Sequence, residues 1–320
     1  MITKKIFKQV LAIVNPVYLV GGSVRDIQLG KEAKDYDFCT PLLPDEIELK
    51  IKTAGHRAYK IGKRFGTVGF KLEGHFIEIT TFRQEKYRAN NRKPIVEFID
   101  NLEQDLSRRD FTMNAIAMNF EKDKLNTIDP FDGLSDIKNK LIKTVGNPLD
   151  RVKEDPLRML RAARFASQLN FDVDSELLKC MQNRADSICS VSRERWLVEL
   201  DGLLLGDNSA KGLQILFDSN LLQYMLPELS LQASFANENL RVEDILWNRT
   251  KNRVSSSKID IEARWAALFR DIGEPFLVQK DVTEINHTKL NKINIELVTG
   301  ISARLKWSKA RTENVIKLLM

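Results

Sequence analysis

Residues 18–40 read YLVGGSVRDIQLGKEAKDYDFCT, and this stretch decides the fold. Its apolar start, Tyr18–Val20, predicts a short buried strand. Gly21 and Gly22 end that strand, and Ser23 stands where it can cap a following helix. The order strand, glycine turn, helix and second strand indicates a mixed α/β unit at the start of the chain.

Two features of this stretch carry chemistry. A helix that begins after a glycine turn presents free backbone N–H groups, which suits a phosphate, and Arg25 lies in its first turn. Asp35 and Asp37 are two apart on the second predicted strand, so both carboxylates point to one face. Mg²⁺ prefers such oxygen ligands. Each feature alone is usually an ordinary turn or strand end, but together they predict equipment for nucleotidyl transfer.

The composition is that of a globular protein. The 320 residues are 43% hydrophobic and 29% charged, and this length favours two or three domains. No run is long and apolar enough to span a membrane, and the N-terminus reads as an amphipathic helix rather than a signal peptide. The three cysteines lack metal-binding spacing, which suits a reducing cytoplasm. A net charge of +6 weakly favours a polyanionic partner.

Residues 58–85 alternate between apolar and polar side chains and contain several glycines, a pattern that predicts β-hairpins. Glu78 lies on one of these strands and is a candidate third carboxylate, although a solvent-facing strand residue explains it equally well. The polar segment 83–94 that follows predicts a mobile loop.

These residues resemble the nucleotidyltransferase signature of the polymerase-β superfamily, specifically the class II tRNA nucleotidyltransferase (CCA-adding enzyme) and bacterial poly(A) polymerase family. Further matching segments are SRRDFTMNA at 107–115, DPFDG at 129–133, KEDPLR at 153–158 and ERWLVE at 194–199. In this family the segment that corresponds to the loop 83–94 helps to switch between CTP and ATP. The usual Asp before Arg-x-Pro is Asn91 here, which puts the loop's partners in doubt.

The resemblance implies a role for each matched residue. Asp35 and Asp37 would hold two Mg²⁺ ions, and Glu78 stays a candidate further metal ligand on the ground of its strand position. The implied triphosphate-binding residues are Gly21, Gly22, Ser23, Arg25 and Asn114, and the implied ribose-binding residues are Arg109 and Asp110. The implied base-recognition residues are Glu154, Asp155 and Arg158, with Arg161 and Arg164 as further nucleotide or RNA contacts.

The chemistry of the bases agrees with the implied template. Asp155 and Pro156 are also good residues for starting a helix, and a capped helix with a solvated basic face is the plainer interpretation of this segment. Cytosine and adenine both offer an amino donor beside a bare ring nitrogen. The Asp155 carboxylate can accept from the amine, and the Arg158 guanidinium can donate to the nitrogen. Uracil and guanine reverse this pattern, so both contacts fail.

The remaining chain predicts helices. Their expected ranges are 42–54, 174–185, 192–205, 209–219, 240–249 and 261–269. The segment 264–275 resembles the His-Asp phosphohydrolase segment of some relatives, but Arg270 replaces the histidine before Asp271. Because a guanidinium cannot replace imidazole as a metal ligand, we expect no phosphohydrolase activity.

The resemblance implies an α+β protein with a seahorse-like arrangement of domains. A polymerase-β-like mixed α/β head at 1–145 is followed by an all-α neck at 146–206 and an all-α body at 207–320. The body contains the degenerate His-Asp-like segment. Its implied activity is addition of CCA to the 3′ end of tRNA from CTP and ATP with Mg²⁺, in the cytoplasm, with no membrane and no protein partner. Longer relatives continue into a tail that grips tRNA, so the chain is either naturally short or cut. Addition of CC or A alone, poly(A) synthesis, and non-catalytic RNA binding stay open as alternatives.

Overall fold

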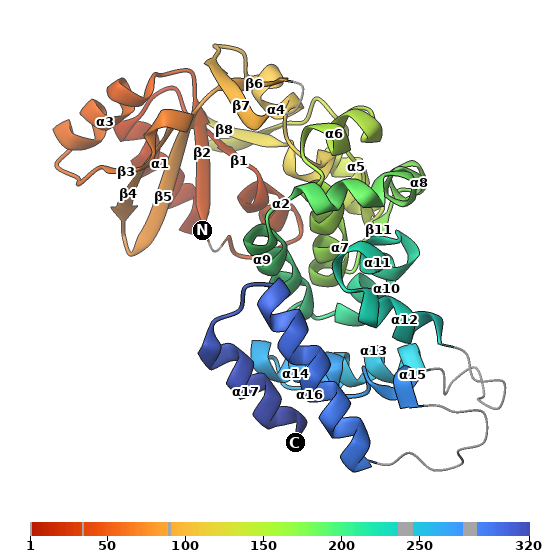
Figure 1. The fold of residues 1–320 in the computed structure, drawn as a ribbon. Coiled ribbons are helices and arrows are strands. Elements are labelled where there is room, and N and C mark those ends of the chain that lie inside the picture. The colour runs from red at the N-terminus through yellow and green to blue at the C-terminus, as the bar shows by residue number, and fades with distance from the viewer. Residues whose placement is uncertain (1, 34, 89–90, 236–245, 278–286) are drawn as a thin grey trace. The chain divides into compact units, whose positions relative to one another are not determined.

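The computed structural model describes residues 2–33, 35–88, 91–235, 246–277 and 287–320. It divides into two compact units, Met1–Glu154 and Asp155–Met320 (Figure 1). The first unit contains a large mixed sheet with helices, and the second is almost entirely helical. This confirms the prediction of an α+β protein with a mixed α/β head followed by helical structure.

The centre of the first unit is a seven-stranded sheet in the order β3-β4-β5-β2-β1-β8-β9 (Figure 1). The β2 and β5 strands run parallel, and the other neighbouring strands run antiparallel. The strands are β1 (Tyr18–Val20), β2 (Tyr36–Thr40), β3 (Tyr59–Gly62), β4 (Thr67–Leu72), β5 (His75–Thr81), β8 (Ala117–Glu121) and β9 (Lys124–Ile128).

One face of this sheet forms the main core of the unit with helices α1 (Ile2–Ile13) and α3 (Pro44–Thr53). Phe7 of α1 packs edge-on against Phe38 of β2, with ring centroids 5.2 Å apart. Phe38, Ile77 and Ile79 are all nearly completely buried on this side. Side chains alternate between the faces of a strand, so the residues between these apolar ones must lie on the opposite face.

The opposite face is buried at one end by a second apolar cluster. Val20 of β1, Cys39 of β2 and Ala117 of β8 pack there with Leu106 of α4 (Leu102–Ser107). The adjoining helical segments of the unit are η1 (Lys63–Phe65), η2 (Thr112–Asn114), α5 (Gly133–Lys138) and α6 (Pro148–Glu154), and β10 (Leu141–Ile142) lies between α5 and α6. This cluster fixes the segment that follows α4, which carries several of the predicted site residues.

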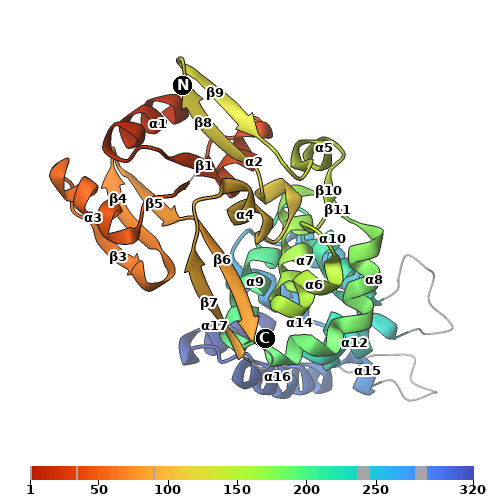
Figure 2. The ribbon, with the colours of Figure 1, turned by 90° about the horizontal axis from the view of Figure 1, so that it is seen from above.

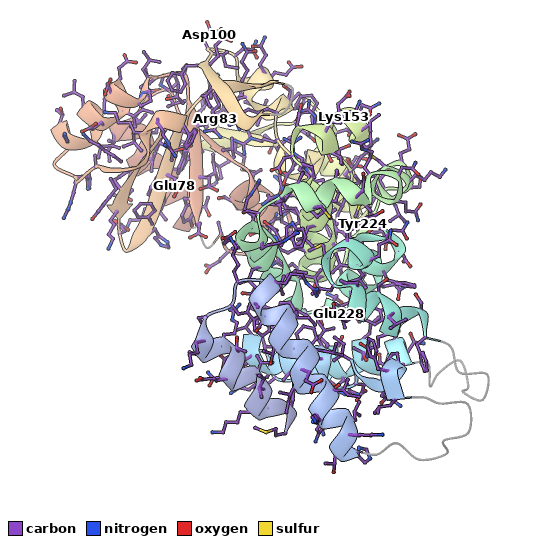
Figure 3. All side chains as sticks on the ribbon, viewed as in Figure 1. Glu78, Arg83, Asp100, Lys153, Tyr224 and Glu228 are labelled. Carbon is purple, nitrogen blue, oxygen red and sulfur yellow. The ribbon has the colours of Figure 1, made fainter. Side chains whose placement is uncertain are left out.

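The prediction of a loop at 83–94 is wrong. Strands β6 (Arg83–Arg88) and β7 (Asn91–Phe98) pair antiparallel as a hairpin of their own, separate from the large sheet (Figure 2). Polar composition indicated a loop, but the ladder of backbone hydrogen bonds forms without an apolar alternation. Arg83, labelled in Figure 3, stands where the hairpin begins.

The second unit begins with α7 (Leu157–Leu169), which is buried along most of its length. The predicted helices at 174–185, 192–205, 209–219 and 261–269 are confirmed as α8 (Ser175–Arg184), α9 (Arg193–Leu204), α10 (Ser209–Asp218) and α14 (Ile261–Phe269). The other elements are β11 (Asp172–Val173), η3 (Ala185–Ser190), α11 (Leu221–Met225), α12 (Pro227–Ser234), α13 (Leu246–Ser256), α15 (Glu274–Leu277), α16 (His287–Arg304) and α17 (Lys309–Leu319).

The helix predicted at 240–249 is only partly testable, since residues 240–245 lie outside the described residues. From Leu246 the chain is helical and continues beyond the predicted end, to Ser256. In the described ranges, no helix combines the length and the apolar character needed to cross a bilayer.

Candidate active site

The turn after β1 requires glycine. Gly21 has φ +72°, in the left-handed region that side chains rarely adopt, and it precedes α2 (Gly22–Gln28). A Cβ atom at Gly21 would lie 3.2 Å from a terminal guanidinium nitrogen of Arg109. The backbone of this turn therefore comes close to Arg109, a residue that the sequence predicted at the same site.

Ser23 does not cap the helix as predicted. It lies inside α2, whose cap position is Gly21. The Ser23 hydroxyl instead donates to the backbone carbonyl of Asp35, at 2.7 Å, and accepts from the backbone N–H of Asp37, at 3.4 Å. The hydroxyl was free for this contact because the backbone turn starts the helix without it. Ser23 thus ties the glycine turn directly to the segment that carries the paired carboxylates.

Asp37 and Glu78 face each other across two parallel strands. Asp37 of β2 is the register partner of Glu78 of β5, and register partners point to the same face. Asp35 immediately precedes β2 and is exposed, whereas Asp37 and Glu78 are partly exposed. Figure 3 labels Glu78 on the large sheet. The three residues therefore come from two adjacent strands in the middle of the sheet, Asp35 just before β2 begins.

Electrostatics in this region follow from burial and like charge. Burial raises the pKa of Asp37, the positive charge of Arg109 opposes this effect, and the negative charge of Asp35 adds to it. Burial also raises the pKa of Glu78, with further contributions from Asp37 and Asp35. A cation bound beside these carboxylates would relieve this repulsion.

A chain of polar contacts joins α2 to the segment after α4. Arg25 donates to the Asn114 side-chain oxygen at 2.9 Å, and Asn114 donates to the Asp110 carboxylate at 3.1 Å. On its other side Arg25 contacts Asp26 at 2.7 Å. Two residues predicted for the triphosphate are thus in direct contact, and one predicted for the ribose adjoins them.

Sequence reasoning missed Asp105, which is completely buried in α4. Its carboxylate accepts from Arg108 at 2.8 and 3.0 Å and lies 3.4 Å from a guanidinium nitrogen of Arg109. It also accepts from the backbone N–H of Arg83, at the start of the β6–β7 hairpin, at 3.1 Å. The spacing of three and four residues from the two arginines places all three on one helical face, a signal that could have identified it.

The oxygen donors present fit a divalent cation of the Mg²⁺ type. Such an ion is commonly held by one or two carboxylates and completes its shell with water and substrate phosphate. Within the described ranges, no group of three or more His, Cys, Asp or Glu side chains is arranged as a metal site. The roles of Asp35, Asp37 and Glu78 as metal ligands stay predictions.

The predicted base-recognition residues lie on both sides of the point in the sequence where the chain divides into two units. Glu154 ends α6 and pairs with Arg151 at 2.6 Å, within the first unit. Asp155 starts the second unit, and its carboxylate accepts from the backbone N–H of Leu157 at 3.1 Å, as a helix cap does. Arg158 lies in the first turn of α7 and is buried.

Helix α9 braces this segment through two residues that the sequence did not assign to the site. Arg195 binds the Asp155 carboxylate with both terminal nitrogens, at 2.6 and 3.3 Å. Glu199 contacts Arg164 at 2.7 Å and Arg161 at 3.5 Å. Through these contacts the ERWLVE segment of α9 holds α7 and the residue Asp155 before it. They give Arg161 and Arg164 a structural role, and their contact with nucleotide or RNA stays a prediction.

The degenerate His-Asp-like segment forms an ion cluster. The Asp271 carboxylate contacts Arg253 and, at 3.2 Å, Arg249. Arg249 also contacts Glu274 at 2.6 Å. Both carboxylates are mostly buried and are paired with arginine side chains.

Comparison with known families matches both units. Residues 17–143 match the Poly A polymerase head domain, and residues 170–232 match the family described as a probable RNA and SrmB-binding site of polymerase A. These matches define the class of the protein: a poly(A) polymerase-type head domain followed by a helical unit that matches a second polymerase A family.

Similar curated proteins narrow this class. The CCA-adding enzyme of Levilactobacillus brevis is 46% identical over 208 residues, which cover 65% of this chain and 51% of that protein. The CCA-adding enzyme of Staphylococcus epidermidis is 34% identical over 310 residues, covering 93% and 75%. The chain belongs to the CCA-adding enzyme family, whose members are nucleotidyltransferases that generally use a divalent metal.

A solved structure agrees along nearly the whole chain. The CCA-adding enzyme of Bacillus stearothermophilus, in a crystal structure with CTP, is 28% identical, with a TM-score of 0.68 over 99% of this chain and 76% of that one. The chain spans about half to three fifths of the length of several curated relatives, with alignments covering 51%, 61% and 57% of them.

Proposed function

We propose that the protein adds CCA to the 3′ end of tRNA, using CTP and ATP and releasing pyrophosphate. The observation that carries this proposal is the Ser23 hydroxyl, which bonds to the backbone at both Asp35 and Asp37. A phosphate-binding turn and a carboxylate pair are thereby held at a fixed separation, as transfer of a nucleotidyl group requires. The family membership supports tRNA as the acceptor.

Asp35 and Asp37 would hold Mg²⁺, since their paired oxygens match its preferred ligands. When bound, the metal would supply Lewis-acid stabilisation of the charge on the reacting phosphate. The chain's own residues would bind and orient the nucleotide. The backbone at Gly21 and Gly22 and the guanidinium of Arg25 would bind the triphosphate oxygens, and Arg25 is already oriented by Asn114.

Arg109 and Asp110 would position the ribose. Arg109 lies against the glycine turn and is held there by Asp105. Asp110 receives a hydrogen bond from Asn114 and is therefore fixed relative to Arg25. A nucleotide held at both its phosphates and its sugar presents its α-phosphate in one orientation, which lowers the entropic part of the barrier.

Base selection is proposed for Asp155, Arg158 and Glu154. Arg195 and the helix N-terminus both fix the Asp155 carboxylate, so its acceptor oxygens have a defined direction. Arg158 is one turn further along α7. A carboxylate and a guanidinium on adjacent turns can accept from an exocyclic amine and donate to a ring nitrogen, which selects C and A.

The direct test supplies tRNA lacking its 3′ CCA with CTP and ATP, separately and together, and sizes the products. The proposal expects two additions with CTP alone and three with both nucleotides. Long adenylate tails with ATP alone would contradict the proposal and indicate poly(A) polymerase activity instead. RNA binding without incorporation of either nucleotide would contradict catalysis.

We further propose a cytoplasmic location and no phosphohydrolase activity in the second unit. Asp271 is engaged by Arg249 and Arg253, so a metal would have to displace two guanidinium groups. Cyclic nucleotides and phosphomonoesters should stay intact in the presence of Mg²⁺, Mn²⁺ or Ni²⁺. Hydrolysis that disappears in an Asp271→Ala variant would overturn this part of the proposal.

A further inference from the structure

Next to the carboxylates, the open face of the sheet carries an aromatic surface. Phe76 of β5 lies across Gly69 of β4, and a Cβ atom at Gly69 would meet the Phe76 ring at 2.6 Å. Tyr59 of β3 continues the surface, with its ring centroid 5.8 Å from that of Phe76. Both rings are partly exposed. The absence of a side chain at Gly69 is what lets Phe76 lie over β4.

A positive charge accompanies this surface. The exposed guanidinium of Arg57 lies over the Tyr59 ring, 5.3 Å from its centroid. Lys71 is the register partner of Phe76, so it shares the same face, and it is exposed. Aromatic rings beside basic side chains are the usual components of a surface that binds single-stranded nucleic acid.

The strand order places this surface on one defined side of the carboxylates. The β2–β5 register, continued by one residue, sets Asp35 opposite Phe76, as Asp37 is opposite Glu78. Gly21 and Arg25 lie beyond β2 on its other side, because they follow β1. The order across the sheet is therefore phosphate-binding turn, carboxylates, aromatic surface.

In nucleotidyl transfer the attacking and leaving oxygens are roughly in line with the reacting phosphorus. On the proposed function, pyrophosphate leaves on the side of Gly21 and Arg25. The attacking 3′-hydroxyl must then arrive from the opposite side, which is the side of β5 and β4. Its own nucleotide would consequently lie over Glu78 and Phe76.

We propose that Phe76 and Tyr59, with Arg57 and Lys71, form the binding site for the terminal nucleotide of the acceptor RNA. This inference rests on the proposed function and names the contact that the acceptor makes. The terminal base changes as nucleotides are added, so its site must tolerate different bases. Stacking on an aromatic ring meets that need because every base has a π-face, and the two cations match the RNA phosphates.

An aromatic ring over a strand glycine also stabilises a sheet, and an aliphatic side chain can provide such cover. The variant Phe76→Leu separates the two roles, since it keeps an apolar group over Gly69 but removes the stacking surface. Its KM for acceptor tRNA should rise about fivefold, the lower part of the range for loss of one stacked base. Its KM for CTP and its thermal midpoint should stay unchanged, and Phe76→Tyr should restore the KM for tRNA.

A second measurement does not depend on turnover. An acceptor RNA with 2-aminopurine at its 3′ terminus should lose fluorescence on binding the wild type, through stacking, and lose much less with Phe76→Leu or Tyr59→Leu. Phe120→Leu is the matched control, because Phe120 is partly exposed in the same unit but packs against Phe7 on the other face of the sheet. It should behave as the wild type.

The outcomes separate the two proposals. If the wild type extends tRNA and Phe76→Leu leaves both the KM for tRNA and the quenching unchanged, the stacking site is wrong while the proposed function stands. If quenching depends on Phe76 but no nucleotide is incorporated, the stacking site stands and the proposed function is wrong. If Phe76→Leu unfolds, Tyr59→Leu decides by the same two measurements.

Discussion

The variant Asp105→Asn tests whether one buried carboxylate holds the site together. Asp105 is completely buried, and its two oxygens contact Arg108, Arg109 and the backbone N–H of Arg83. Asparagine keeps the size of the side chain but removes the negative charge. Two guanidinium groups then lose their common counter-charge in the interior of the first unit.

The expected loss of stability follows from burial. Breaking a buried ion pair by removing one partner costs about 3–5 kcal/mol. The side chains of Arg108 and Arg109 keep 18% and 19% exposure, so both can recover some solvation. We therefore expect a loss of stability at the lower end of this range, about 3 kcal/mol. This loss raises the equilibrium constant for opening of the first unit by about two orders of magnitude. For a unit of this length it lowers the thermal midpoint by about 6–12 °C.

The chain offers a separate probe for each unit. Cys39 is buried in the apolar cluster with Leu106, next in sequence to Asp105, so a thiol reagent reaches it only when the first unit opens. Replacing Cys180 and Cys189 with serine leaves Cys39 as the sole thiol. The four tryptophans all lie in the second unit, so their fluorescence reports that unit alone. Asp105→Asn should accelerate Cys39 labelling about a hundredfold and leave the tryptophan transition unchanged.

A labelling rate within about threefold of the parent protein would refute the argument, because no buried pair could then have been broken. Asp123→Asn is the control. Asp123 pairs with Lys8 at 2.7 Å in the same unit, but its side chain is 81% exposed. Surface pairs contribute little, so this variant should label at the parent rate.

Three further predictions concern the site itself. Asp35→Ala or Asp37→Ala should abolish nucleotide incorporation without unfolding the protein, and retention of more than a few per cent of turnover would contradict the metal assignment. Arg158→Ala should reduce the preference for CTP and ATP over UTP and GTP by about one to two orders of magnitude in kcat/KM. Arg161→Ala should instead lower overall activity, and the reverse pattern would show that the base is read one turn further on. With a metal chelator present, the Asp37→Asn substitution should raise the midpoint temperature of thermal unfolding at pH 7. Burial raises the pKa of Asp37 in the fold, so ionisation there destabilises the folded state. The gain should vanish at acid pH, where both states are protonated, and a gain that persists there would contradict this cause.

Local patterns were enough to predict where several candidate residues of the first unit lie. Gly21 was assigned from its place between a strand and a helix, and its positive φ supports that reason. Asp35 and Asp37 were assigned to one face from the two-residue period of a strand. Glu78 lies between Ile77 and Ile79, so burial of those two residues already places its carboxylate on the opposite face.

What could not be predicted depends on contacts between distant segments. Serine is a common helix-capping residue. Only the position of the segment before β2 shows that the Ser23 hydroxyl bonds to the backbone of that segment instead. The β6–β7 hairpin has few apolar residues to reveal a strand, and its backbone ladder is set by pairing rather than by composition. The spacing of Asp105 from Arg108 and Arg109 indicates that they can pair, but the burial of Asp105 follows only once the strands around it are in place.

The same strand residues specify both the core and the open face that carries Asp37. Asp37 stands between Tyr36 and Phe38, each only 2% exposed, so its carboxylate is on the open face because its neighbours are on the buried one. A shift of the β2–β5 register by one residue would bury the carboxylate and expose both rings. Burial of the core therefore opposes a register error that would misplace the proposed metal ligands. Substitutions that keep apolar side chains at 36 and 38 should preserve the position of Asp37, even where they weaken the packing around it.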